Sequence, residues 1–320
     1  MTNSGRITNI EWLRIVAMLA VVLIHIDACY TYTILPATRF AVPFFFMVAG
    51  YFLGEQNKKK NWKKYIIRSL ILLLSATLLY AAVDFVGSWH SGRNICDRSW
   101  GQILMTWIVF NKNPFHYHLW FLSAYLYVII IGALIDKFNA WKQIYWLIVP
   151  LLIARFGIQL LDFPPYITRN FLFIGLPCFL LGSWFRSKQN IFSSHLSQKG
   201  IVWICCFILI LPFVEDYLLQ NAFGIQYGDL FTSYIFAFCL LFAAVYLPQV
   251  LQQYLPHQTR DLVLGIYIIH PLVQLIYQHV LSSRALIIYN TWFAPIIVFI
   301  TSWLICRAVF LLYEILKKKQ

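Results

Sequence analysis

An arginine and a histidine lie in the first apolar stretch of the chain, which reads EWLRIVAMLAVVLIH over residues 11–25. On an α-helix the steps from Arg14 to His25 add up to about 1,100°, about 20° beyond three full turns, and to about 16 Å along the axis. The two side chains therefore project from nearly the same face. A guanidinium binds phosphate oxygens in a planar fork, and histidine is the usual general base for a hydroxyl that attacks an acyl carbon. The spacing suits a coenzyme A thioester, with phosphates at one end and the acyl group at the other.

A structural interpretation of the same two residues stays open. In it, Arg14 extends its charged end to the membrane interface and pairs with Glu11 one turn back, while His25 is a satisfied core histidine. An ionisable side chain inside an apolar span is costly without a partner or a pathway, which favours a functional role.

The elements that carry these residues are expected to be membrane spans. The chain has 320 residues, of which 61% are hydrophobic and only 12% charged, whereas soluble domains are about half apolar and about a quarter charged. We expect an all-α polytopic membrane protein with about ten transmembrane helices, and no linker or repeat divides residues 1–320, so a single integral-membrane domain is expected. The expected spans are residues 12–31, 38–54, 66–87, 118–137, 143–160, 167–185, 201–219, 229–249, 262–282 and 292–315.

The basic residues predict the orientation of these spans. Most of the 25 Lys and Arg residues, including the cluster Lys58–Lys64, fall on the side that holds both termini, and the positive-inside rule then places the termini in the cytoplasm. The net charge of +13 is thus expected to reflect topology and not nucleic-acid binding. Residues 103–110, in the outer loop 88–117, are apolar but too short to cross a bilayer. Pro43 and Gly50 favour a broken or tilted second span.

Four segments together resemble a known family. They are Arg14-x10-His25 within IEWLRIVAMLAVVLIH, VPFFFMVAGYFL at 42–53, YHLWFLSAYLY at 117–127 and LGIYIIHPLV at 264–273. With these motifs the chain resembles the acyltransferase-3 family of bacterial membrane acyltransferases, and it looks most similar to the branch that contains the enterobacterial common antigen O-acetyltransferase. The resemblance implies transfer of an acyl group, most often acetyl from acetyl-CoA, to a hydroxyl of an extracytoplasmic glycan or lipid-linked sugar.

The resemblance also assigns roles to particular residues. His25 matches the essential histidine of the family, and Arg14 matches its essential arginine. Many members carry R-x-x-R at the start of span three, where this chain has Lys64 and Arg68 one turn apart. Because a lysine lacks the guanidinium fork, contact with the phosphates of CoA is carried over more firmly to Arg68 than to Lys64.

Three further residues are candidates for a substrate or supporting role. His118 and Trp120 are expected at the outer end of span four, and His270, followed by Pro271, is expected in the middle of span nine. They are candidates for orienting the base or holding the acceptor. The alternatives are the aromatic belt of the membrane interface for His118 and Trp120, and packing for His270. His116 is expected to be an ordinary loop residue.

These observations predict an enzyme, a multi-pass O-acetyltransferase of the bacterial inner membrane that moves acetyl from cytoplasmic acetyl-CoA to a cell-surface or lipid-linked polysaccharide. Direct attack by the hydroxyl and a transient acyl-histidine both fit. Acetyl-CoA is the expected co-substrate, and no metal is expected. The expected partners are a glycan acceptor and membrane lipids, and nucleic acid is not expected to bind. A transporter or flippase for a lipid-linked glycan is the alternative, because intramembrane His and Arg also line transport pathways, and a non-catalytic sensor is a third. The acceptor sugar and the oligomeric state are not predicted.

Overall fold

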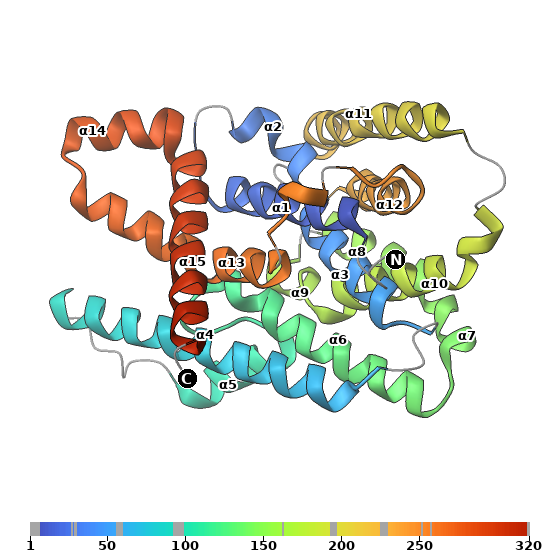
Figure 1. The fold of residues 1–320 in the computed structure, drawn as a ribbon, viewed down its shortest axis with the longest axis horizontal. Helices are drawn as coiled ribbons and strands as arrows, with labels where there is room; N and C mark the ends of the chain where they lie inside the picture. The colour runs from blue at the N-terminus through green and yellow to red at the C-terminus, as the bar shows by residue number, and fades with distance from the viewer. Residues whose placement is uncertain are drawn as a thin grey trace. The chain divides into compact units, whose positions relative to one another are not determined.

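All regular secondary structure in the described part of the chain is helical (Figure 1). The computed structural model describes residues 7–26, 28, 31–55, 60–91, 99–161, 163–192, 197–224, 230–250, 252–256 and 258–318. An α-helix satisfies its backbone polar groups internally, as a segment in hydrocarbon must. The all-α class is therefore confirmed.

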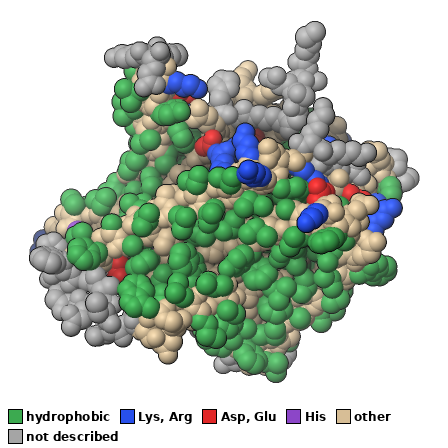
Figure 2. Space-filling model, turned by 90° about the horizontal axis from the view of Figure 1, so that it is seen from below, with side chains coloured by type: hydrophobic (Ala, Val, Ile, Leu, Met, Phe, Trp, Pro, Cys, Tyr) green, Lys and Arg blue, Asp and Glu red, His purple; other side chains and the backbone are tan. Residues whose placement is uncertain are grey.

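Eight helical segments of the described chain are long and apolar enough to cross a membrane. They are Thr8–His25, Thr33–Leu53, Trp62–Gly87, Tyr117–Lys137, Trp141–Leu160, Gln198–Ala222, Thr259–Val280 and Ser283–Lys317. Each overlaps an expected span, and several boundaries differ. Large apolar side chains are exposed on these helices, among them Leu78 on Trp62–Gly87 and Trp203 on Gln198–Ala222. Figure 2 shows hydrophobic side chains over a wide area of one face, with lysine and arginine gathered in separate patches. The protein is a multi-pass membrane protein.

The two other expected spans are helical but do not meet the same criteria. Residues 165–192 form α9 (Pro165–Thr168), the π-helical turn η4 (Phe171–Gly175) and α10 (Leu176–Phe192). The helix α12 (Phe231–Tyr246) is apolar but has only 16 residues, about 24 Å of helix against about 30 Å of hydrocarbon. The count of ten and the orientation of the termini remain predictions.

The described chain forms two compact units. Unit 1 contains Met1–Phe45 and Ser193–Gln320, and unit 2 contains Phe46–Phe192. Of the predicted site residues, Arg14, His25 and His270 belong to unit 1, and the others belong to unit 2. Each unit is described by itself.

The helix α1 (Thr8–His25) is at the centre of the packing in unit 1, because it contacts α2, α12, α13 and α15. Its buried side chains include Ile10, Met18 and Val22. The helices α13 and α15 pack together, and α11 lies beside α12 (Figure 1). The remaining elements of unit 1 are α2 (Thr31–Thr38), α11 (Gln198–Phe223), η5 (Gln252–Tyr254), α13 (Thr259–Val280), α14 (Ser283–Ile288), the π-helical turn η6 (Tyr289–Phe293) and α15 (Ala294–Lys318).

Unit 2 is built around α6, which packs against α4 and η4, and around α10, which packs against α8 and η4. The apolar helix α5 has 11 residues, and none of them is buried. It is too short to cross a bilayer, as expected for residues 103–110. The elements are α4 (Trp62–Ser91), α5 (Trp100–Phe110), η2 (Tyr117–Leu119), α6 (Trp120–Lys137), α7 (Trp141–Ile144), η3 (Tyr145–Leu147), α8 (Ile148–Leu160), α9, η4 and α10, preceded by most of α3 (Ala41–Leu53).

Of the two alternatives for the second span, a break at Pro43 or Gly50 is wrong, while a tilted helix stays a prediction. The helix α3 is continuous through both residues, and the break lies earlier, in a turn at residues 39–40. Pro43 falls in the first turn, where its missing N–H has no helical acceptor. A Cβ on Gly50 would lie 1.8 Å from the carbonyl oxygen of Phe179 on α10. Gly50 therefore allows α3 and α10 to touch along their backbones, which any side chain would prevent.

Candidate active site

The start of α1 is fixed to the end of α12 by a single asparagine. The Asn9 side-chain amide donates to the carbonyl oxygens of Leu247 at 3.2 Å and Pro248 at 3.1 Å, and the N–H of Val250 donates back to Asn9 Oδ1 at 3.3 Å. From there α1 runs without a break to His25. Arg14 and His25 therefore lie on the same helix face, about 16 Å apart along the axis.

The end of α1 differs from the prediction. The expected first span continued to residue 31, but the helix ends at His25, where Ile26 turns to an extended conformation and donates its N–H to the carbonyl of Val22. Residues 27, 29 and 30 lie outside the described chain. His25 is consequently an exposed side chain in the last turn of a helix and not a buried residue in mid-span. An exposed imidazole at this position is open to a substrate.

Arg14 is largely buried and ion-paired one turn back. Its Nη1 donates to Oε1 of Glu11 at 2.6 Å, and the two side chains are 13% and 10% exposed. This is the contact that the structural interpretation of Arg14 predicts. The pair keeps the charge of Arg14 on the face of α1 that carries His25, and a guanidinium is a group that binds phosphate oxygens.

The structure brings His25 together with His270. Their ring centroids are 5.6 Å apart, with α1 supplying one ring and α13 the other. His270 is completely buried, and its Nδ1 lies 2.9 Å from the carbonyl oxygen of Tyr267 and 3.2 Å from that of Ile266. A carbonyl only accepts hydrogen bonds, so Nδ1 is the protonated nitrogen, and Nε2 carries the lone pair in the neutral ring.

The sequence His270-Pro271 explains why this histidine has a fixed tautomer. In a regular helix the N–H of residue 271 would donate to the carbonyl of Tyr267, but proline has no N–H. The carbonyl of Tyr267 is thereby left for His270 Nδ1, which satisfies it at 2.9 Å. The helix α13 continues through Pro271 to Val280. Proline and histidine together therefore set the ring beside His25.

Lys64 and Arg68 lie one turn apart on α4, as the spacing predicted, and both are exposed. The side chain of Asn61 caps this helix, because its Oδ1 accepts the backbone N–H of Lys64 at 3.0 Å. The cap fixes the position at which α4 begins and hence the face on which the two cations project. Both belong to unit 2, whereas Arg14 belongs to unit 1.

His118 and Trp120 are buried, with 2% and 7% of their surface exposed. Nδ1 of His118 and Nδ1 of His116 form a hydrogen bond. Both rings pack against Tyr80 on α4, with centroid distances of 4.9 Å for His118 and 4.7 Å for His116. Asn113 holds the backbone of His116, whose N–H donates to Asn113 Oδ1 at 3.3 Å.

His116 lies in the loop before η2, as expected, and in addition it forms a pair with His118. The pKa of His116 is lowered because burial disfavours the charged ring. The His-x-His spacing at 116–118 was the signal in the sequence.

Lys60 has a role that the sequence pattern did not reveal. Within the predicted topological cluster Lys58–Lys64, of which residues 58 and 59 lie outside the described chain, Lys60 is only 3% exposed. Its Nζ contacts Asp136 Oδ1 at 2.7 Å and donates to the carbonyl of Gly54 at 2.9 Å. Trp62 and Trp141 each donate an indole N–H to the same carboxylate at 3.0 Å. Inside a run of lysines, no local signal separates the buried member from the exposed ones.

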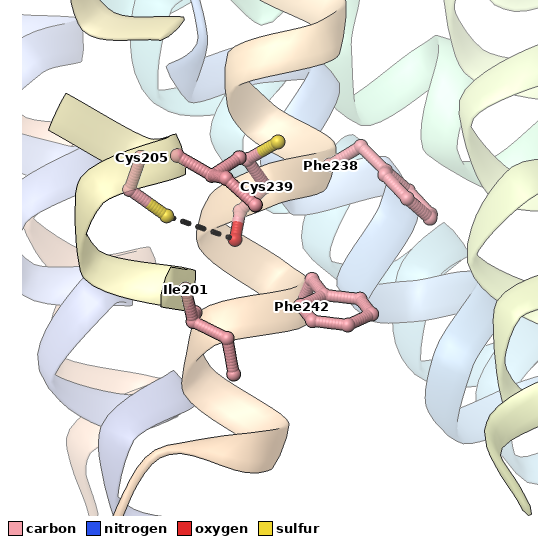
Figure 3. A pocket seen from close by; sticks show the side chains of 6 residues that line it. Ile201, Cys205, Phe238, Cys239 and Phe242 are labelled. Carbon is pink, nitrogen blue, oxygen red and sulfur yellow. Dashed lines mark hydrogen bonds between the residues drawn. The ribbon is translucent and has the colours of Figure 1, made fainter. Parts of the chain in front are cut away.

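No metal cluster marks another reactive centre among the described residues. They contain no group of three or more His, Cys, Asp or Glu placed to hold a metal ion. Figure 3 shows an apolar groove of about 160 Å³ between α11 and α12, where Cys205 Sγ donates to the carbonyl oxygen of Cys239 at 3.6 Å. Apart from these two thiols the groove is lined by Ile201, Ile204, Phe238 and Phe242. It offers nothing for acid–base chemistry.

The fold and the paired histidines define a polytopic all-α membrane protein with ionisable groups on its helices. The sequence model of the acyltransferase-3 family, described as an acyltransferase domain, matches residues 7–311, and the chain belongs to this family.

Curated relatives also match most of this chain. It is 26% identical over 338 aligned residues to a serine/alanine racemase of Enterococcus gallinarum, a match that covers 94% of this chain and 45% of the racemase. It is 24% identical over 336 residues to an amino-acid racemase of Enterococcus faecalis, covering 94% and 46%. The chain thus spans about half the length of the curated relatives it matches. No solved structure matches it.

Proposed function

We propose that the protein is an O-acetyltransferase of the bacterial inner membrane. It moves acetyl from cytoplasmic acetyl-CoA to a hydroxyl of a cell-surface or lipid-linked polysaccharide, as the branch with the enterobacterial common antigen enzyme does. The observation that carries the proposal is the pair formed by His25 on α1 and His270 on α13, with ring centroids 5.6 Å apart. The helix α1 also carries Arg14. Membership of an acyltransferase family supports the reaction class.

His25 is the general base in this reaction. Its imidazole takes the proton of the acceptor hydroxyl as the oxygen attacks the thioester carbonyl. The tetrahedral intermediate collapses, the carbon–sulfur bond breaks, and the CoA thiolate leaves and takes up the proton. The products are an acetyl ester and free CoA. In the acyl-histidine route His25 itself attacks first, and the same products form in two steps.

His270 is a positioning residue for His25. Because its Nδ1–H is held by the carbonyl of Tyr267, the ring presents a lone pair at Nε2. Such a nitrogen can accept a hydrogen bond from the imidazolium that His25 becomes after taking the proton. The arrangement stabilises the charged form of His25 when charge develops, which is when stabilisation accelerates the reaction.

Arg14 binds the phosphates of acetyl-CoA in the proposal. Arg68 and Lys64, which are exposed on α4 of unit 2, stay candidates for contact with these phosphates in their own right. Charge-assisted hydrogen bonds between a guanidinium and phosphate are about twice as strong as neutral ones. Glu11 holds Arg14 in place and also competes with the ligand for it, a property that experiments can use. His118 and Trp120 remain candidates for contact with the acceptor.

Acetyl-CoA turnover by the purified protein tests the proposal. In nanodiscs, the parent should release CoA from acetyl-CoA and transfer labelled acetyl to glycans, and His270→Ala should lower the rate while binding acetyl-CoA normally. Movement of a lipid-linked glycan across proteoliposomes without release of CoA would favour the transporter alternative. Racemisation of serine or alanine in the same samples, without acetyl transfer, would favour the activity that names the relatives.

A further inference from the structure

A second set of polar groups lies inside unit 1, beyond the histidine pair. Tyr289 at the start of η6 donates its hydroxyl to Oε1 of Gln274 on α13 at 2.6 Å. The hydroxyls of Tyr277 on α13 and Thr301 on α15 are 2.9 Å apart. The rings of Tyr277 and Tyr289 lie 5.1 Å apart between centroids. Three elements thus converge on one cluster of hydroxyl, amide and aromatic groups, and the reaction scheme above uses none of them.

The cluster continues the helix face that carries His270. Relative to His270, Gln274 is rotated by about 40° and displaced by about 6 Å along α13, and Tyr277 is rotated by about −20° and displaced by about 10 Å. The polar face therefore begins at the ring next to His25 and extends for two turns toward the end of α13 at Val280. In the predicted orientation of the chain, this end of α13 lies on the outer side.

A π-helical turn places Tyr289 in the cluster. The N–H of Ala294 donates to the carbonyl of Tyr289, five residues back, so the helical register shifts within η6. Tyr289 is 4% exposed. Such turns are rare and occur frequently at functional sites, since they re-aim side chains at a cost in helix regularity. Here the re-aimed side chain is the one that binds Gln274.

The chemistry of the cluster fits an uncharged, hydroxyl-rich ligand. Its members offer two phenolic hydroxyls, an amide and two ring faces, and none of these carries a charge. Their hydrogen bonds are made to one another, so ligand hydroxyls can replace them at a small net cost, because exchanging one neutral hydrogen bond for another changes the free energy little. Aromatic ring faces pack on the C–H faces of sugar rings. A phosphate would instead require cationic donors.

We propose that Gln274, Tyr277 and Tyr289 form the acceptor subsite, which binds a neutral sugar residue and presents its hydroxyl to His25. The role of the bound sugar as acetyl acceptor rests on the proposed function. The binding of a neutral sugar is argued from the residues of the cluster alone. A site that hydrogen-bonds substrate hydroxyls discriminates strongly against analogues that lack them, so this cluster also contributes to the choice of sugar.

The test uses the full-length protein in nanodiscs with methyl glycosides of glucose, galactose and N-acetylglucosamine as probes. Tyr289→Phe and Gln274→Met remove one polar group each with little change of shape. Tyr313→Phe, at a tyrosine of α15 that is 62% exposed, is the matched control. Two quantities are measured: the KM for the glycoside in acetyl transfer, and the rise in the thermal unfolding midpoint that the glycoside causes without acetyl-CoA.

We expect each subsite variant to raise the glycoside KM roughly three- to tenfold, the equivalent of one neutral hydrogen bond, with the KM for acetyl-CoA at the parental value. The glycoside should stabilise the parent and the Tyr313 control, and it should stabilise the two variants by less. Parental glycoside KM and parental stabilisation in both variants would overturn the subsite and leave the proposed function intact. Stabilisation that depends on Tyr289, in a protein without acetyl transfer, would support the sugar subsite and overturn the proposed function.

Discussion

Replacement of Arg14 by alanine should weaken the binding of acetyl-CoA and also lower the stability of the protein. The guanidinium lies 2.6 Å from Glu11 Oε1, and both side chains are nearly buried. Removing one partner of a buried ion pair costs about 3–5 kcal/mol, because the other charge stays behind without compensation. We expect a value at the low end of this range, since neither group is fully desolvated. A loss of binding in Arg14→Ala alone would thus have two explanations.

A second variant, Glu11→Gln, separates these explanations. If Arg14 binds phosphate, neutralising Glu11 removes the competitor, and acetyl-CoA should bind at least as tightly as to the parent. Arg14→Ala should then weaken binding by roughly 10- to 100-fold, the equivalent of about 1.5–3 kcal/mol for a hydrogen bond to a charged group. Arg14→Lys should recover only part of this loss, because an ammonium has no planar fork.

The assay is equilibrium binding of labelled acetyl-CoA to each variant in nanodiscs, with thermal unfolding followed in parallel. The double variant Glu11→Gln/Arg14→Ala should bind as weakly as Arg14→Ala but be more stable, since no buried carboxylate is left unpaired. If Arg14→Ala binds acetyl-CoA as the parent does, Arg14 is a structural partner of Glu11. Equal losses of affinity in Glu11→Gln and Arg14→Ala would likewise refute a direct role.

Three further predictions concern unit 2 and the topology. Arg68→Ala should raise the KM for acetyl-CoA severalfold, and an unchanged KM in correctly inserted protein would remove Arg68 from the donor site. Lys60→Met should lower the free energy of unfolding by about 2–3 kcal/mol, less than the loss of a fully buried pair would, because Asp136 is 33% exposed. The control Lys63→Met removes an exposed charge from the same cluster. Equal unfolding midpoints for the two variants would contradict a stabilising role for the contact between Lys60 and Asp136. A periplasmic reporter fused after Gln320 should be inactive, and an active fusion would overturn the cytoplasmic termini.

The sequence was sufficient to predict which segments are helical and which residues on α1 share a face, because hydropathy and the helical repeat act locally. It was also sufficient to single out His270. It was not sufficient to predict that α1 ends at His25, since neither glycine nor proline marks that end. In the structure the helix ends there, and His25 is exposed.

Contacts between residues that are far apart in the sequence could not be predicted either. Lys60 and Asp136 are 76 positions apart, and nothing in either neighbourhood indicates that they meet. The π-helical turn at Tyr289–Phe293 was likewise not predicted, because its sequence, YNTWF, carries no motif that marks such a turn. The meeting of His25 and His270 needed either the structure or the family resemblance, because the two are 245 residues apart.

Acetyl transfer by His25→Ala is the most direct test of the central claim. The variant should bind acetyl-CoA with the affinity of the parent, because a general base contributes little to donor binding, and its transfer rate should fall by about 10²- to 10⁴-fold. Both quantities are measured on the same nanodisc preparation, with labelled acetyl-CoA. A His25→Ala protein that binds acetyl-CoA and still transfers acetyl at a near-parental rate would contradict the assignment of His25 as the catalytic base.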